Sequence, residues 1–276
     1  MAAVRSSNRP AVIAHRGASA HRAEHTLAAY GLALEHGADG LECDVRLTRD
    51  GRLVCVHDRR VDRTSTGRGV VSASDLASLA AYDYGSWHDE LESADDLVER
   101  RLGAQVTHPH HRGLLVLDDL LDLITDWRRG VRLFVETKHP VRYAGLVEAK
   151  LVALLARYGL AAPASKDEST VVMMSFSARA VRRVRAEAPA LPTVLLLSKL
   201  GRAPEGRLPP WADIAGPGIR SLRADPDYVA RAASRGHPTY CWTVDDPADA
   251  QLCRDAGVRY IATNRPAETR ELLTGP

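Results

Sequence analysis

Two carboxylates and an imidazole come close together in residues 40–58, a segment that reads as two strands joined by a tight turn. The Asp-Gly pair at 50–51 is a strong signal for a two-residue turn between antiparallel strands. With that pair as the loop, Asp44 is expected directly opposite His57, and Glu42 shares their face because alternate side chains point the same way. Buried carboxylates need a partner, so this face predicts a divalent cation.

Further polar residues stand at the ends of other strand-like segments. In an α/β barrel, polar side chains at the C-terminal ends of the strands form the active site. An unpaired charge is costly inside an apolar strand, which makes such interruptions informative. The candidates that this rule adds to the hairpin are His15, Arg16, Glu136, Lys138 and Trp242.

The residue types in this set are typical of metal-assisted chemistry on a phosphate. Three carboxylates are oxygen ligands that suit Mg²⁺ or Ca²⁺ better than Zn²⁺. Two cations can balance the charge that develops on a phosphodiester oxygen, and two histidines titrate near neutrality as base and acid. The carboxylates are Glu42, Asp44 and Glu136, the cations Arg16 and Lys138, and the histidines His15 and His57.

Short β-rich runs alternate with amphipathic helical stretches, which predicts a parallel sheet with crossover helices. Residues 53–57 follow the preceding strand too closely for a parallel crossover, so we expect an antiparallel flap there. Eight other strands remain, the number that closes a (β/α)₈ TIM barrel. They are expected at 11–14, 40–47, 132–137, 170–176, 193–198, 218–222, 239–244 and 260–263. Helices are expected at 26–36, 117–127, 143–158, 178–186, 227–233 and 247–256.

Two segments interrupt this alternation. Residues 59–113 are too long for an ordinary βα loop, and they are expected to form a small inserted subdomain over the barrel mouth. Residues 201–218 are rich in proline and glycine and give no clear helix. The whole chain, 1–276, is interpreted as one barrel domain that contains this insert.

Composition limits the classes of function. The 276 residues are 45% hydrophobic and 26% charged, with a formal net charge of +2, so the chain has material for a core and no basic excess for nucleic acid. No leader or membrane-spanning run is evident, so no stable membrane insertion is expected. Four cysteines without CxxC spacing are interpreted as buried thiols, which favours the cytoplasm. The oligomeric state stays open.

Several ordered motifs resemble those of the glycerophosphodiester phosphodiesterase family, from about residue 12 to residue 266. They are Ala14-His15-Arg16-Gly17-Ala18, Glu24-His25-Thr26, Glu42-Cys43-Asp44, His57-Asp58, Glu136-Thr137-Lys138 and Trp242-Thr243-Val244. The resemblance continues in the insert, through Asp62-Arg63-Thr64-Ser65 and Gly85-Ser86-Trp87.

The resemblance implies a TIM barrel that hydrolyses glycerophosphodiesters to an alcohol and sn-glycerol 3-phosphate. It implies catalytic roles for His15 and His57, and a small-molecule substrate that Trp87 in the insert helps to enclose. By the same resemblance, the family's Ca²⁺ or Mg²⁺ ligands correspond to Glu42, Asp44 and Glu136. Its phosphate contacts correspond to Arg16 and Lys138. Whether water or the glycerol 2-hydroxyl attacks, and which histidine is the base, stays open.

Two positions depart from the family pattern. His25 stands where the family commonly has asparagine, and Asn264 where it usually has aspartate. Neither is expected to touch the metal ligands, although both bear on substrate fit or on the surroundings of His15. The histidines at 108, 110 and 111 lack accompanying carboxylates and are interpreted as an exposed loop rather than a second metal site.

Two other functions fit the same residues. One is cleavage of a lysophospholipid in the manner of a phospholipase D, which would need an apolar or strongly basic membrane-facing segment that the sequence does not show. The other is a non-catalytic sensor of a phosphate ligand. The presence of both histidines and all three carboxylates argues against the sensor.

Overall fold

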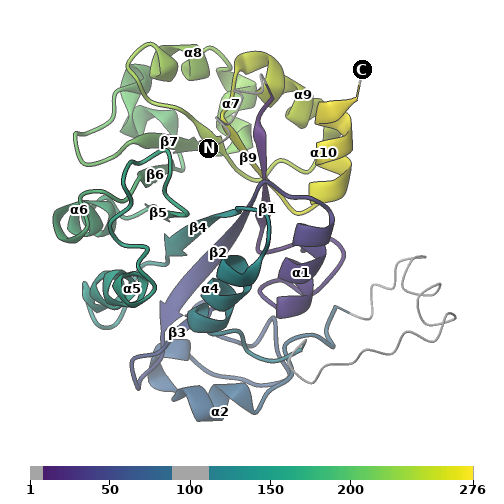
Figure 1. Ribbon diagram of the computed structural model, residues 1–276, viewed down its shortest axis with the longest axis vertical. Helices are drawn as coiled ribbons and strands as arrows, with labels where there is room; N and C mark the ends of the chain where they lie inside the picture. Colours follow the sequence, from purple (N-terminus) through teal and green to yellow (C-terminus); the bar gives the residue numbers. More distant parts are fainter. Residues whose placement is uncertain (1–8, 89–111, 276) are drawn as a thin grey trace, which may run out of the picture.

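The computed structural model of the chain describes residues 9–88 and 112–275. Within them, eight parallel strands form a nearly closed barrel in the order β7-β6-β5-β4-β2-β1-β9-β8, and β3 pairs antiparallel with β2 (Figure 1). Isolated bridges from Ala215 to Thr239 and from Gly218 to Trp242 join the two end strands. The strands are β1 Ala11–His15, β2 Gly40–Leu47, β3 Leu53–Cys55, β4 Arg132–Thr137, β5 Val171–Ser175, β6 Thr193–Leu197, β7 Ile214–Pro217, β8 Tyr240–Cys241 and β9 Tyr260–Thr263.

Helices surround the barrel, as Figure 1 shows for α5 and α6 on one flank and for α9 and α10 on another. Their apolar faces pack on the outward side chains of the strands, and a second cluster around Phe134 and Tyr240 fills the barrel interior. The helices are α1 Leu27–Glu35, α2 Leu76–Ala80, α4 Leu117–Asp126, α5 Leu146–Arg157, α6 Ala178–Glu187, α7 Ile219–Ala224, α8 Tyr228–Ala233, α9 Pro247–Ala256 and α10 Pro266–Thr274, with 3₁₀ turns η1 Val71–Ala73, η3 Leu200–Arg202 and η4 Pro204–Gly206.

Local sequence explains several helix boundaries. The hydroxyl of Thr26 accepts a hydrogen bond from the amide of Ala29 and begins α1. Helix α9 begins with Asp246 as its cap and Pro247 in its first turn, and it ends at Gly257, whose φ of 83° is the left-handed conformation that glycine favours.

One predicted strand is wrong. Residues 218–222 begin helix α7, and the barrel strand is β7, immediately before them. The apolar side chains of Ile219 and Leu222 are buried at helical spacing, which a short window does not distinguish from a strand. The close approach of β6 favours glycine at position 216, because a Cβ there would lie 2.8 Å from the Leu196 side chain and 3.1 Å from its Cα. Helix α10 was not predicted at all.

The register of the β2–β3 hairpin also differs from the prediction. Val45 pairs with Cys55 and the amide of Val56 donates to the carbonyl of Asp44, so Val56, not His57, lies opposite Asp44. The loop has three residues, since the amide of Thr48 donates to the carbonyl of Arg52 at 2.9 Å. Gly51, with φ of 80°, occupies the left-handed position of such a loop.

The segment after β3 forms a small apolar cluster of its own on β3. It includes Val61, Val71, Leu79 and Tyr84 packed on Val54. The rest of the predicted insert, including the histidines at 108, 110 and 111, lies largely outside the described residues.

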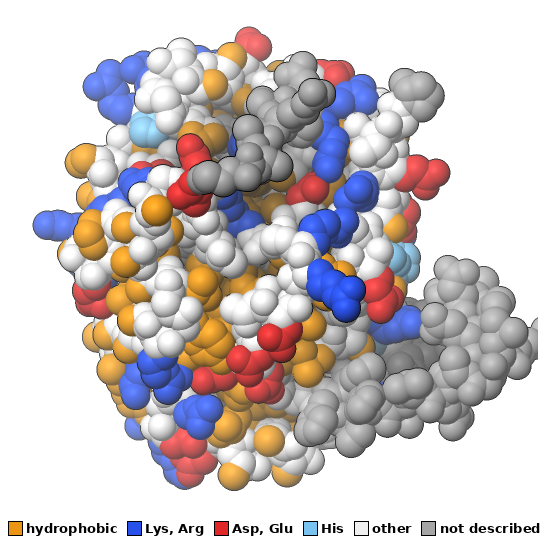
Figure 2. Space-filling view, viewed as in Figure 1, with side chains coloured by type: hydrophobic (Ala, Val, Ile, Leu, Met, Phe, Trp, Pro, Cys, Tyr) orange, Lys and Arg blue, Asp and Glu red, His pale blue; other side chains and the backbone are white. Residues whose placement is uncertain are grey.

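The exterior matches the nearly neutral composition. On the face shown in Figure 2, basic and acidic side chains are intermixed over the surface. Among the described helices, none combines the length and apolar character that crossing a bilayer requires.

Candidate functional site

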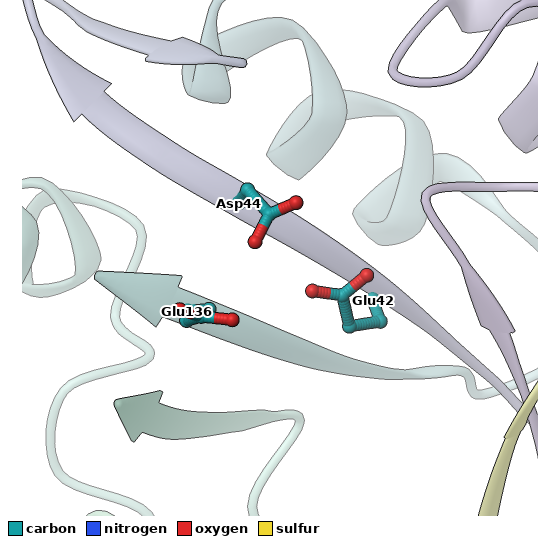
Figure 3. A group of neighbouring side chains, drawn as sticks. All are labelled: Glu42, Asp44 and Glu136. Atoms are coloured by element: carbon teal, nitrogen blue, oxygen red, sulfur yellow. The ribbon is translucent and has the colours of Figure 1, made fainter. Parts of the chain in front are cut away.

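Three buried carboxylates converge at the C-terminal ends of two neighbouring strands. Glu42 and Asp44 lie on β2, and Glu136 lies on β4, where it pairs in register with Asp44. One oxygen from each carboxylate lies within 4.8 Å of the others, and the three side chains point toward a common space (Figure 3). The structure thus brings together the three metal ligands that the sequence predicted.

Two cations lie against this cluster. The Nζ of Lys138 is 2.9 Å from Glu136 Oε1 and 3.2 Å from Asp44 Oδ1. The Nε of Arg16 is 3.0 Å from Asp44 Oδ2, and the Arg16 amide donates to Glu42 Oε2 at 3.0 Å. Both cations are therefore where an anionic substrate held at the cluster would meet them.

The electrostatics of the cluster fit a divalent cation. Burial, followed by the charge of Asp44, raises the pKa of Glu42 well above its usual range and that of Glu136 to about 8. Burial alone would raise the pKa of Asp44 as well, but Arg16 and His25 hold it well below its usual range. Two side-chain cations do not neutralise the negative charge of three neighbouring carboxylates. Oxygen ligands of this kind suit Mg²⁺ or Ca²⁺.

This crowding predicts a stability effect in metal-free protein. The folded pKa of Glu136, about 8, exceeds its ordinary 4.5, so its contribution to stability is present below pH 4.5 and lost as pH rises through 8. In chelator at pH 8, Glu136→Gln should raise the melting temperature by about 2 °C or more. Glu187→Gln, on the exposed side of α6, is the matched control and should change nothing. A lower melting temperature for Glu136→Gln would contradict this electrostatic account.

His15 ends β1 and is oriented by the residue that follows the last barrel strand. Its Nδ1 lies 2.8 Å from Asn264 Oδ1, and the Asn264 amide group donates to Asp245, which fixes its oxygen toward the ring. The His15 Nδ1 therefore carries the proton, and Nε2 faces Glu42 at 3.9 Å. Burial and the charge of Arg16 lower the pKa of His15 to about 3, so the imidazole is neutral near pH 7.

His57 reaches the site although it is not opposite Asp44. It follows the end of β3, where Arg46 donates to its carbonyl oxygen from Nε at 3.0 Å and from Nη2 at 2.8 Å. Its Nδ1 lies 2.7 Å from Asp58 Oδ1, and Arg63 binds the other oxygen of Asp58. Burial lowers the pKa of His57, while the charge of Asp44 opposes that shift, which places the ring within electrostatic reach of the cluster.

His25 is a functional contact that the sequence interpretation placed away from the ligands. Its Nε2 lies 3.0 Å from Asp44 Oδ2, so the expectation that neither departure touches the metal ligands is wrong for His25. The other ring nitrogen lies 2.9 Å from the hydroxyl of Tyr30, which donates to the carbonyl of Glu42. The feature of the sequence that could have indicated a role for His25 is its place in the Glu24-His25-Thr26 motif. Its contact with Asp44 depends on a φ of 60° that sequence does not show.

The contact of His25 predicts a graded effect on metal binding. Groups that orient metal ligands typically change metal affinity by roughly 10–100-fold when removed. We expect His25→Ala to weaken Mg²⁺ or Ca²⁺ binding by about tenfold, measured by calorimetry, and His25→Gln to retain most of it because its amide nitrogen reaches the position of Nε2 and can still donate to Asp44. Equal affinities for all three proteins would show that His25 does not position Asp44.

The two tryptophans proposed as substrate contacts are not part of the carboxylate cluster. The indole of Trp242 donates to the carbonyl of Gly216 at 2.8 Å and packs edge-on against Phe176. The indole of Trp87 donates to the carbonyl of Tyr84 at 3.0 Å and packs against His88. Both rings are thus held by neighbours of their own.

The fold is a (β/α)₈ barrel with a metal-capable acidic cluster at the C-terminal ends of its strands, where barrel enzymes carry their active sites. Comparison with known proteins shows to which family of barrel enzymes the chain belongs. The model of the glycerophosphoryl diester phosphodiesterase family matches residues 15–268. The chain belongs to this family, and it is an enzyme, a phosphodiesterase.

Individual relatives agree. The chain is 52% identical over 269 residues to the probable glycerophosphodiester phosphodiesterase 1 of Mycobacterium tuberculosis, covering 96% of this chain and 92% of the relative. It is 33% identical to the glycerophosphodiester phosphodiesterase of Bacillus subtilis, covering 95% and 85%. A phosphodiesterase of Oleispira antarctica, solved with the product sn-glycerol-3-phosphate, shares the fold with a TM-score of 0.79 at 23% identity, covering 96% of each chain.

Proposed function

We propose that this enzyme hydrolyses glycerophosphodiesters to an alcohol and sn-glycerol 3-phosphate, in a reaction that requires a divalent cation and two histidines. The observation that carries the proposal is the convergence of three carboxylates and two cations beside His15 at one end of the barrel. His57 is added because the charges of Asp44, Arg16 and Lys138 act on its ring. The names of the relatives support the same substrate class.

In this proposal, Glu42, Asp44 and Glu136 hold Mg²⁺ or Ca²⁺, which when bound supplies positive charge to the phosphoryl oxygens. Arg16 and Lys138 bind and orient the phosphate, because each places its charge against the carboxylate cluster. A phosphodiester placed there gains charge-assisted hydrogen bonds as negative charge develops on its oxygens.

The partners of the two histidines favour different roles. His15 has a neutral amide partner at Nδ1 and is uncharged near pH 7, so the lone pair of its Nε2 is free to accept a proton from the nucleophile. His57 has the ionised partner Asp58, which favours its protonated form relative to His15. We therefore assign His15 as the base and His57 as the acid that protonates the departing alkoxide.

The surroundings of the site would set how the substrate is enclosed. We propose that residues 59–113 form a small subdomain over the barrel mouth and that Trp87 and Trp242 contribute apolar surface to the glycerol end. The cluster of Val61, Val71 and Leu79 on the flap supports a packed unit in the described part of that segment.

The proposal is tested by incubating the purified enzyme with glycerophosphocholine and Mg²⁺ or Ca²⁺, and by measuring sn-glycerol 3-phosphate with a coupled dehydrogenase. Release of this product is expected, together with its loss in chelator. Lysophosphatidylcholine is the comparison substrate, and clear preference for it would favour a lipid phosphodiesterase instead. Binding of glycerophosphocholine without turnover would favour a sensor.

The site of action in the cell is a separate proposal. All four cysteines, Cys43, Cys55, Cys241 and Cys253, are buried and form no disulfide. Free thiols in this number are typical of a reducing compartment, so we propose the cytoplasm.

A further inference from the structure

A cavity of about 200 Å³ lies at the rim of the barrel, beside the flap. Its walls come from the end of β2, from the segment after β3, from the loop between β4 and α5 and from the first turn of α5. The lining is half apolar, through Leu47, Val71, Pro140, Val141 and Val147, and half polar, through Ser72, Tyr143 and three arginines, Arg46, Arg59 and Arg142.

The three guanidinium groups give this cavity its chemical character, since no carboxylate of the described residues lines it. Arg59 and Arg142 are exposed, and neither has an ion-pair partner among residues 9–88 and 112–275. The guanidinium carbon of Arg142 lies 5.6 Å from the centre of the Tyr143 ring, which holds the side chain over an aromatic face. Guanidinium groups bind phosphate and carboxylate oxygens through paired hydrogen bonds, so an oxyanion suits this lining.

Arg46 connects the cavity to the proposed catalytic residues. It lies on β2 two residues after Asp44 and donates twice to the carbonyl of His57. The same side chain lines the cavity. One residue therefore joins the wall of the cavity to the strand that carries Asp44 and to the backbone of His57.

The walls of the cavity are held in place by contacts that cross between segments. The hydroxyl of Tyr143 donates to the carbonyl of Ser72 at 3.1 Å and so ties the β4–α5 loop to the segment after β3. The same loop is anchored below by His139, whose Nε2 lies 2.7 Å from the buried carboxylate of Glu148. The cavity is thus preformed rather than dependent on substrate.

We propose that this arginine-lined cavity binds an anionic group carried by the departing alcohol, and that it makes the enzyme prefer glycerophosphodiesters whose alcohol bears a second phosphate. This inference rests on the proposed function, and it adds a substrate class. Water would add across the scissile P–O bond, with sn-glycerol 3-phosphate and the phosphate-bearing alcohol as products. A cationic alcohol such as choline would be repelled by the same three charges.

The test compares three substrates at low ionic strength. They are glycerophosphocholine, glycerophosphoglycerol, and the compound in which a second glycerophosphate is esterified to the glycerol of glycerophosphoglycerol. The last two differ in one phosphodiester charge, so the ratio of their kcat/KM values measures how much the cavity favours the second charge. For the wild-type enzyme we expect a preference of about fivefold or more for the doubly charged substrate, weakened by added salt.

Variants locate the preference. Arg59→Gln combined with Arg142→Gln should bring the ratio close to one and raise turnover of glycerophosphocholine, because the repulsion of choline is reduced. Arg182→Gln, exposed on α6, removes an equal charge elsewhere and should leave the ratio unchanged. A wild-type ratio of one or less, or a double variant that keeps the preference, overturns the inference.

Two further outcomes are separable. If the wild-type ratio is one and sulfate changes wild-type turnover of glycerophosphocholine but not that of the double variant, the cavity binds a free anion and the assignment to the alcohol is wrong. If the wild-type enzyme hydrolyses none of the three substrates, the proposed function itself has failed. Hydrolysis of all three without discrimination rejects the cavity assignment alone.

Discussion

Alanine at position 15 or 57 is expected to lower kcat for glycerophosphocholine hydrolysis by about 10²–10⁴-fold, the range for removal of a general acid or base. The loss follows from the contacts of each ring, since Asn264 and Asp58 fix Nδ1 and leave Nε2 for the reaction. The melting temperatures should change little, because neither residue belongs to the apolar core. Steady-state kinetics with the coupled assay measures the effect.

The assignment of acid and base has its own test. A glycerol phosphodiester of nitrophenol has a leaving group that departs without protonation, so His57→Ala should recover most of its activity with it, and His15→Ala should not. His237→Ala is the control, because that ring contacts the carbonyl of Asp213 away from the site. Recovery by His15→Ala instead would reverse the two roles, and a near-wild-type rate in either variant would remove it from the mechanism.

Removal of the divalent cation is expected to abolish turnover, and Glu42→Gln should raise the cation concentration needed for half-maximal activity by at least about tenfold. The reason is that Glu42 is buried beside Asp44 and Glu136, so its charge has few other partners. Titration of chelated enzyme with Mg²⁺ and with Ca²⁺ measures the shift. Excess cation should restore part of the activity of the variant.

A matched substitution separates metal binding from charge in general. Glu271→Gln, on α10 outside the site, also removes one carboxylate and should leave the titration unchanged. Full activity of the wild-type enzyme in chelator would show that the carboxylate cluster serves another purpose. Equal half-saturation for Glu42→Gln and wild type would remove Glu42 from the ligand set.

The sequence predicted the barrel, and with it the three carboxylates and two cations that the structure places together. Strands 40–47 and 132–137 were predicted at their observed bounds, because short apolar runs with charged residues at alternate positions are typical of strands that carry a site at their ends. Strand β7 was missed because its Gly216 and Pro217 are residues that normally count against a strand.

Contacts between segments distant in sequence were harder to predict. The hairpin register failed by one residue because an Asp-Gly pair also fits a three-residue loop with glycine in the left-handed position. A one-residue shift changes which face a side chain occupies, and the backbone of His57 beyond β3 is held by Arg46, a contact that the hairpin pattern does not predict. The contact of His25 with Asp44 likewise depends on a turn geometry that no periodicity reveals.

The bond between His15 and Asn264 joins residues 249 positions apart, at the end of the first barrel strand and directly after the last one. A nascent chain emerging from the ribosome therefore makes every proposed ligand, cation and imidazole before it makes the amide that aligns one of them. We therefore expect the chain to become active only after nearly all of it has been synthesised and the barrel has closed. Fragments that end between residues 138 and 264 would carry the full set of reactive groups and still be inert.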